Sequence, residues 1–317
     1  MIMEIIKEAD YSRAIKEKIA PEIESVRTDG FFISFDETRI FYHTYKAENA
    51  DRSVVIVHGF TESAEKYEEL IWYFLKAGAD VYIYDQRGHG RSGRKVANKT
   101  LTHVDRFPEY LSDLECFIDS VVSKELPLFL FAHSMGGAVA GLYMEKHPDA
   151  IKKAALSSPM IAPSTGGFPP FVGRAICRTM ILFGGAKKRI FLSSEYPGEE
   201  KFEGSCDTSE PRFSHYEYFK RTHADYQNYS PTYRWTLESL LITRKLMKKG
   251  APEGVRTDVL ILSAGLDTVV SIPAQMKFAE RLPSCRVISY PDAKHEIYYS
   301  TDDVMEKFIP EIIDFLK

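Results

Sequence analysis

One serine lies where an apolar, strand-like run of the sequence meets a helix-like pattern. The apolar residues 128–132 lead towards Ser134, and Gly136 and Gly137 then open a helix-like pattern. This predicts a buried strand, a tight turn and a buried helix, with the Ser134 hydroxyl held at the turn. Backbone N–H groups at the start of such a helix favour negative charge. The turn therefore suits a nucleophile whose reaction creates an oxyanion.

A serine hydroxyl needs a base to become nucleophilic, and the base needs an acid to orient it. His295 and Asp267 each lie in a loop just past the end of a predicted strand, as Ser134 does. Ligands of open α/β sheets collect outside the carboxyl ends of the strands. We therefore predict Ser134 as nucleophile, His295 as base and Asp267 as the partner of the base.

Other residues compete for these roles. His133 adjoins the serine, but neighbours across a sharp turn point apart, so we expect it to support the turn from behind. Asp292 is near His295 in sequence, yet we expect it to shape the turn with its neighbouring proline. His89 and His103 lie in polar loops and could line the site without acting as the base.

An oxyanion hole needs two backbone donors. Met135, which follows the predicted nucleophile, should give one. The other should come from the loop at residues 58–61, which follows the strand at residues 54–57, and we predict the N–H of Phe60. His58 is expected to brace this loop.

One motif resembles a dinucleotide-binding loop. Residues 88–93 match GxGxxG after a strand, but the polar sequence that follows lacks the apolar period of a dinucleotide-binding helix. The sequence has no HExxH, P-loop or EF-hand pattern. We therefore predict no cofactor and no metal.

Charge and composition narrow the class of protein further. The net charge of −4 gives no electrostatic case for nucleic acid binding. The four cysteines are far apart, which predicts free thiols in a reducing compartment. The N-terminus does not resemble a signal peptide, and no apolar window reaches the length of a transmembrane helix. We expect a cytoplasmic protein; the sequence does not report its oligomeric state.

Short apolar runs alternate with helical patterns along most of the chain, which predicts an α/β fold with a mostly parallel sheet and helices on both faces. We assign residues 1–158 to the first part of the core, with 1–28 as an N-terminal extension, and 234–317 to its second part. Residues 159–233 break the pattern and are too long for a structureless loop, so we expect an inserted lid, or cap, subdomain.

These motifs resemble those of the α/β-hydrolases, in the branch of bacterial lysophospholipases and monoacylglycerol lipases. The resemblance covers residues 30–160 and 232–317. The segments that carry it are His58-Gly-Phe, Asp85-Gln-Arg-Gly-His-Gly-Arg-Ser, His133-Ser-Met-Gly-Gly, Pro231-Thr-Tyr-Arg-Trp, Gly265-Leu-Asp and His295. Ala132 departs from the glycine that is usual before the nucleophile. The resemblance implies an α/β-hydrolase fold and a carboxylic-ester hydrolase with a lid over an acyl-binding cleft.

The resemblance and the apolar lid together predict a single-chain lipid ester as substrate, either a lysophospholipid or a monoacylglycerol. We expect Phe168, Phe171, Arg174 and Met180 to contact it, and a transient contact with a membrane surface. One alternative is an esterase, thioesterase or peptidase for a small non-lipid acyl compound, since the fold does not fix the substrate. The other is a binding protein that keeps the fold without turnover.

Overall fold

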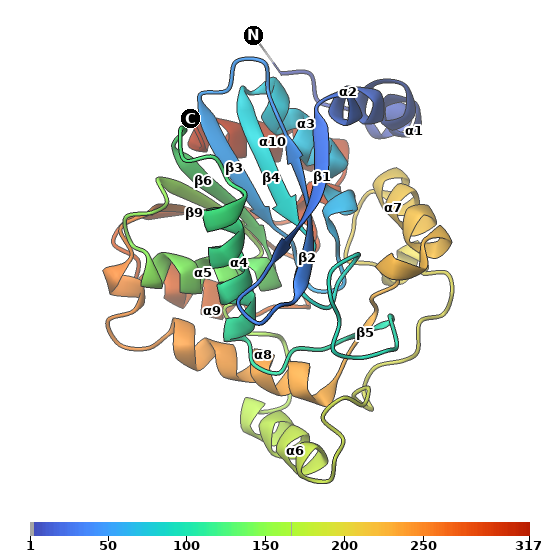
Figure 1. Ribbon diagram of the computed structural model, residues 1–317, viewed down its shortest axis with the longest axis vertical. Helices are drawn as coiled ribbons and strands as arrows, with labels where there is room; N and C mark the ends of the chain where they lie inside the picture. The colour runs from blue at the N-terminus through green and yellow to red at the C-terminus, as the bar shows by residue number, and fades with distance from the viewer. Residues whose placement is uncertain (1–2, 166) are drawn as a thin grey trace.

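The computed structural model describes residues 3–165 and 167–317, and an eight-stranded sheet forms their centre (Figure 1). The strand order is β1-β2-β4-β3-β6-β7-β9-β10. All pairs from β4 to β10 are parallel, whereas β2 is antiparallel to both β1 and β4. The strands are β1 (Arg27–Ile33), β2 (Arg39–Tyr45), β3 (Arg52–Val57), β4 (Ala79–Tyr84), β6 (Leu128–His133), β7 (Lys153–Ser157), β9 (Asp258–Ala264) and β10 (Cys285–Tyr290). A separate small sheet pairs β5 (Leu101–Thr102) with β8 (Ser230–Pro231).

Helices cover both faces of the large sheet, so the predicted α/β architecture is confirmed. One face packs against the N-terminal helices, α3 and α10, and the other against α4, α5, α8 and α9. The N-terminal helical segment consists of α1 (Tyr11–Ala14), a π-helical turn (Ile15–Ile19) and α2 (Ala20–Ser25). The remaining helices are α3 (Glu68–Lys76), α4 (Pro108–Ser120), α5 (Met135–Lys146), α6 (Pro170–Leu182), α7 (Glu210–Thr222), α8 (Tyr233–Leu246), α9 (Ile272–Ala279) and α10 (Asp302–Phe315).

The central strands are buried on both faces, which explains why they could be predicted from the sequence. Every residue of β3 is buried, because Val54 and Ile56 pack into the core on one face while Val55 and Val57 pack into the core on the other. A strand covered on both faces needs apolar side chains in both directions, and it therefore reads as a continuous apolar run.

The parallel strands bring four loops to one edge of the sheet. The 58–61 loop follows β3, Ser134 follows β6, Asp267 lies just past β9, and His295 lies just past β10. The strands run towards the end of the molecule where α6 and α8 lie (Figure 1). The predicted chemistry is thus gathered where the carboxyl ends of the strands meet.

Three local details complete the fold. The helix after β3 starts as a 3₁₀ turn at Ala64–Tyr67 and becomes α-helical only in α3. The first strand begins at Arg27, inside the segment assigned to the extension, because it pairs along its whole length with β2. Pro310 lies inside α10.

The chain between β7 and α8 contains two helices that lie apart in Figure 1. Helix α6 packs against α8, where Cys177, Ile190, Tyr233 and Leu237 form a small apolar cluster. Helix α7 lies beside the N-terminal helical segment. The two halves of the stretch 159–233 therefore rest on different parts of the molecule. Within the described residues, no helix combines the length and the apolar character that are needed to cross a membrane.

A buried arginine fastens α7 to the core. The Arg212 side chain is fully buried, and its guanidinium donates two hydrogen bonds to the Glu69 carboxylate of α3, at 2.9 and 3.0 Å. It also donates to the carbonyl oxygens of Ile6 and Ser300, at 2.8 and 3.1 Å. One side chain thus joins α7 to the N-terminal segment, to α3 and to the start of α10.

Replacing Arg212 by methionine is expected to lower the free energy of unfolding by about 3–5 kcal/mol, because the Glu69 carboxylate would stay buried without its cation. Urea unfolding measures the loss. The control is Arg221→Met on the same helix, because the Arg221 side chain is 42% exposed and lies 3.8 Å from Glu199 and 3.7 Å from Glu217. The expected change is within about 0.5 kcal/mol. Adding Glu69→Leu to Arg212→Met should recover part of the stability; a loss for Arg212→Met equal to that of the control would contradict the prediction.

Candidate active site

The turn between β6 and α5 holds Ser134 in an unusual backbone conformation. Its φ is 51° and its ψ is −116°, a region that non-glycine residues rarely adopt and that costs about 1–3 kcal/mol. Neighbouring strands and loops hold the turn in place, since the N–H of Ser134 donates to Ser157 O at 3.0 Å and its carbonyl accepts from Met160 N at 2.8 Å. The strain is retained because the surrounding backbone fixes it.

Gly136 lets the first turn of α5 lie directly against the end of β3. A Cβ atom at this position would stand 2.0 Å from the carbonyl oxygen of Val57 and 2.7 Å from that of His58. Any side chain here would push the helix away from the 58–61 loop. The close approach places the start of α5, which includes Met135, beside the loop that carries Phe60.

Ser134, His295 and Asp267 form one continuous hydrogen-bonded chain. The Ser134 hydroxyl donates to His295 Nε2 at 2.8 Å, and His295 Nδ1–H donates to Asp267 Oδ2 at 2.7 Å. Ser134 is 4% exposed and His295 5%. The three residues that were predicted from separate loops are therefore brought together, in an arrangement that can activate a hydroxyl as a nucleophile.

The environment of Asp267 keeps its carboxylate ionised. Burial by itself would raise the pKa of this group, but the hydrogen bond from His295 and those from the backbone N–H groups of Val269 and Val270 lower it below the usual value. An ionised acceptor at Nδ1 places the imidazole proton on Nδ1. The other ring nitrogen is then free to accept the proton of Ser134.

The two predicted oxyanion donors are both uncommitted. Among the described residues, neither the N–H of Phe60 nor that of Met135 donates a hydrogen bond to another group. By contrast, the N–H groups on either side of Phe60 are engaged: that of Gly59 donates to Glu62, and that of Thr61 donates to His89 Nε2 at 3.3 Å. The loop thus leaves the Phe60 donor available, as an oxyanion hole requires.

The competing histidines have other partners. His133 is buried behind the turn and donates from Nδ1 to Ser157 O at 3.1 Å. His58 donates to Gly59 O and accepts from the N–H of Gln86, both at 2.8 Å, which braces the loop. Burial lowers the pKa of both imidazoles, most strongly that of His133, so both rings are neutral.

The remaining competitors lie away from the hydrogen-bonded chain. Burial also holds the pKa of His89 well below its usual value, and its ring supports the 58–61 loop. His103 contacts Thr232 Oγ1 at 2.9 Å and Asp105 Oδ1 at 3.1 Å. Asp292 is exposed and makes no hydrogen bond to His295.

The Pro231-Thr-Tyr-Arg-Trp segment has a structural role at this site. Thr232 caps α8, because its hydroxyl accepts from the N–H of Trp235. Trp235 lies on the ring of Phe60, with the two ring centroids 4.1 Å apart, and its indole N–H donates to Tyr110 at 3.2 Å. Helix α8 therefore positions an aromatic wall against the loop that supplies the predicted oxyanion donor.

The residues predicted to contact substrate are placed less uniformly. Phe168 and Phe171 are each 64% exposed, Arg174 is partly buried, and Met180 packs against the small apolar cluster between α6 and α8. The structure does not bring these four side chains together with Ser134. Their contact with substrate stays a prediction.

A buried group of charges next to His295 was not anticipated from the sequence. It contains Glu62, Lys66 and Glu296, which are all buried or nearly so. Glu62, Glu296 and His133 could each offer a ligand atom to a metal ion, within 4.8 Å of one another. However, the Lys66 ammonium bonds Glu296 and lies 3.6 Å from Glu62, so a cation already occupies the position between the carboxylates. Burial alone would lower the pKa of Lys66, but Glu296 and Glu62 raise it well above the usual value.

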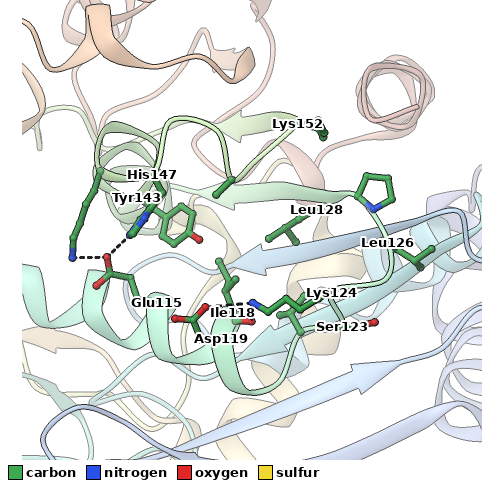
Figure 2. Close-up of a pocket in the computed structure, with 14 residues that line it drawn as sticks. Glu115, Ile118, Asp119, Ser123, Lys124, Leu126, Leu128, Tyr143, His147 and Lys152 are labelled. Carbon is green, nitrogen blue, oxygen red and sulfur yellow. Dashed lines mark hydrogen bonds and ion pairs between the residues drawn. The ribbon is translucent and has the colours of Figure 1, made fainter.

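A hollow of about 650 Å³ lies at the opposite end of the strands from Ser134 (Figure 2). It is lined by residues near the start of β6 and the ends of α4 and α5, such as Leu128, Asp119 and His147. The six residues of β6 separate it from Ser134 by about 20 Å. Its charged side chains pair mostly with one another: Glu115 bonds Lys146 and His147. This hollow is separate from the candidate active site.

Comparisons with known proteins identify the family of the chain. Residues 48–302 match the Hydrolase_4 family, described as "Serine aminopeptidase, S33". Lysophospholipase L2 of Escherichia coli K12 is 29% identical over 299 residues, which span 91% of this chain and 87% of the relative. Monoglyceride lipase of Saccharomyces cerevisiae is 26% identical over 306 residues, 89% of this chain and 91% of the relative.

Solved structures confirm the α/β-hydrolase fold. A soluble variant of Saccharomyces cerevisiae monoglyceride lipase, in complex with a substrate analogue, superposes with a TM-score of 0.75 at 22% identity, covering 92% of this chain and 95% of the other. A carboxyl esterase from Bacillus coagulans gives 0.74 at 19% identity, covering 92% and 98%. The chain belongs to the Hydrolase_4 family and is a serine hydrolase with the α/β-hydrolase fold.

Proposed function

We propose that the protein hydrolyses carboxylic esters through an acyl-enzyme, with Ser134 as nucleophile, His295 as base and Asp267 as its partner. The observation that carries the proposal is the hydrogen-bonded chain from Ser134 through His295 to Asp267, which lies beside two uncommitted backbone donors. No other described serine combines a strained turn, a helix N-terminus and a hydrogen bond to an imidazole.

In this mechanism, Ser134 Oγ attacks the ester carbonyl while His295 Nε2 takes the hydroxyl proton. Asp267 stabilises the resulting imidazolium and keeps its proton on Nδ1. The N–H groups of Phe60 and Met135 donate to the oxyanion of the tetrahedral intermediate. His295 then protonates the leaving alcohol, and afterwards activates the water that releases the acid.

We infer that the substrates are single-chain lipid esters, of the lysophospholipid or monoacylglycerol type. The similarity to lysophospholipase L2 and monoglyceride lipase supports this class. So does the insertion, which exposes large apolar side chains that suit contact with acyl chains or a lipid surface. These side chains are Phe168, Phe171, Leu182, Phe183, Phe191 and Leu192, each at least 63% exposed.

A polar hollow of about 150 Å³ beside the site suits the alcohol part of such an ester. It is lined by Thr61, which follows Phe60, and by Glu296, which follows His295. Lys66, Asp207 and Tyr216 also line it. A polyol would find hydrogen-bond donors and acceptors there, which an acyl chain cannot use.

The test is a matched panel of substrates: monoacylglycerol, lysophosphatidylcholine, nitrophenyl esters of short and long chain, and an aminoacyl nitroanilide. We expect hydrolysis of the esters, with a preference for long chains, and a fluorophosphonate adduct on Ser134 located by mass spectrometry. Activity confined to short esters would remove the lipid assignment. Cleavage of the nitroanilide alone would favour the peptidase that the description of the family suggests. Failure of both labelling and turnover would favour a binding protein.

A further inference from the structure

Glu62 lies in the loop after β3 and is only 4% exposed. Its carboxylate accepts three hydrogen bonds: from the N–H of Gly59, from the Tyr67 hydroxyl at 2.7 Å and from the Tyr298 hydroxyl. Burial alone would raise the pKa of this carboxyl, but Lys66 and the two phenols lower it below the usual value. The group is therefore an ionised, buried carboxylate that accepts hydrogen bonds from one backbone N–H and two phenol hydroxyls.

The bond to Gly59 fixes the backbone that carries the proposed oxyanion donor. The carbonyl of Gly59 and the N–H of Phe60 belong to the same planar peptide group and point in opposite directions. Glu62 holds the N–H of Gly59, and His58 Nδ1–H holds its carbonyl oxygen at 2.8 Å. With both ends of Gly59 held, the direction of the Phe60 N–H is set before substrate arrives.

The bond to Tyr298 fixes the loop that carries the proposed base. Tyr298 lies three residues after His295, in the 3₁₀ turn Ile297–Tyr299. Its ring stacks on that of Tyr67, with centroids 5.1 Å apart, and contacts the ring of His133, which itself lies 4.8 Å from the His295 ring. Lys66 adds a second link, because it bonds Glu296, the residue directly after His295.

We propose that Glu62 is a positioning residue that joins the oxyanion loop, through Gly59, to the histidine loop, through Tyr298. The inference rests on the proposed roles of Phe60 and His295. Glu62 does not touch the reacting atoms; it acts through the two loops that do. Its effect should therefore fall on kcat rather than on KM, since alignment of the oxyanion donor and the base matters in the transition state.

The experiment compares Glu62→Ala, Glu62→Gln and Tyr298→Phe on a soluble nitrophenyl ester, with kcat and KM determined separately. Glu62→Ala should lower kcat by about 100-fold, the scale of losing one oxyanion donor, with KM within about threefold of the parent. Glu62→Gln should stay within about tenfold, because an amide oxygen can still accept from Gly59 while the Tyr298 hydroxyl turns to accept from the amide. Tyr298→Phe removes only one of the two links and should fall between the parent and Glu62→Ala.

The matched control is Glu65→Gln, which lies three residues further along. Glu65 is also a mostly buried carboxylate, but it pairs with Arg27 and His43 and contacts neither loop. It should lose stability, as measured by urea unfolding, while keeping kcat within about twofold of the parent. If Glu62→Ala does not fold, Tyr298→Phe decides the question, because it removes the link to the histidine loop.

The inference is overturned if the folded Glu62 and Tyr298 variants keep the kcat of Glu65→Gln, or if their losses lie in KM alone. It fails separately from the proposed function. If Ser134 proves essential but the Glu62 variants keep full activity, only the positioning role of Glu62 is removed. If turnover persists without Ser134, the proposed function itself is removed.

Discussion

Replacing Ser134 by alanine is expected to reduce ester hydrolysis by about 10⁵-fold or more, the scale seen when the nucleophile of a comparable triad is removed. The hydroxyl that donates to His295 is the only atom of the residue that would form the acyl bond, and alanine supplies none. The measurement is kcat/KM on the preferred ester, with purified variant and parent at equal folded concentration. Some activity over water should persist, because the oxyanion donors remain.

A second serine gives a matched control for this substitution. Ser158, at the carboxyl end of the neighbouring strand β7, is also buried and also has a positive φ, of 43°. Its hydroxyl has no hydrogen-bond partner among the described residues. Ser158→Ala should keep hydrolysis within about threefold of the parent. Comparable losses for the two variants would mean that the strained turns, and not the Ser134 hydroxyl, are what activity requires.

Replacing Asp267 by asparagine is expected to lower kcat by about 10³- to 10⁴-fold. The amide oxygen would still accept from the N–H groups of Val269 and Val270, so the side chain would place its NH₂ group against His295 Nδ1. That contact favours the tautomer with the proton on Nε2. Such an imidazole cannot accept the proton of Ser134.

The matched control is Asp292→Asn, which removes the same charge from the same loop as His295 but from an exposed position. Its kcat should stay within about twofold of the parent. The pH dependence of the residual activity of Asp267→Asn adds a second reading, since the rate should rise with pH as the wrong tautomer is bypassed by hydroxide. Full activity of Asp267→Asn would transfer the role of partner to another acid.

The sequence predicted the sheet because its parallel strands are buried on both faces. Continuous apolar runs such as those of β3 and β6 have few alternative structures when turn residues bound them. Ser134, Asp267 and His295 could be predicted for the same reason, because each lies within five residues of the end of a strand and parallel strands end at one edge of the sheet. Local pattern and chain order were sufficient for this part of the site.

The burial of Glu62 could not be predicted from the sequence. In the sequence it stands four residues before Lys66, a spacing that usually indicates an exposed ion pair on a helix. Its decisive partner, Tyr298, is 236 residues away. Nothing local distinguishes a solvated glutamate from one that is buried by the return of the chain.

The attachment of residues 159–233 to the core likewise could not be predicted from the sequence. Its sequence breaks the alternating pattern, which identified the segment, but α7 is largely polar and has no wide apolar stripe. Its attachment depends on Arg212, whose partners Glu69, Ile6 and Ser300 come from three distant parts of the chain. The fold class and the three residues at the sheet edge could be predicted from the sequence, because the apolar period and the strand ends are local features. Burial of a charged group depends on partners that are far away in the chain, so the charges buried around the site became known only from the folded structure.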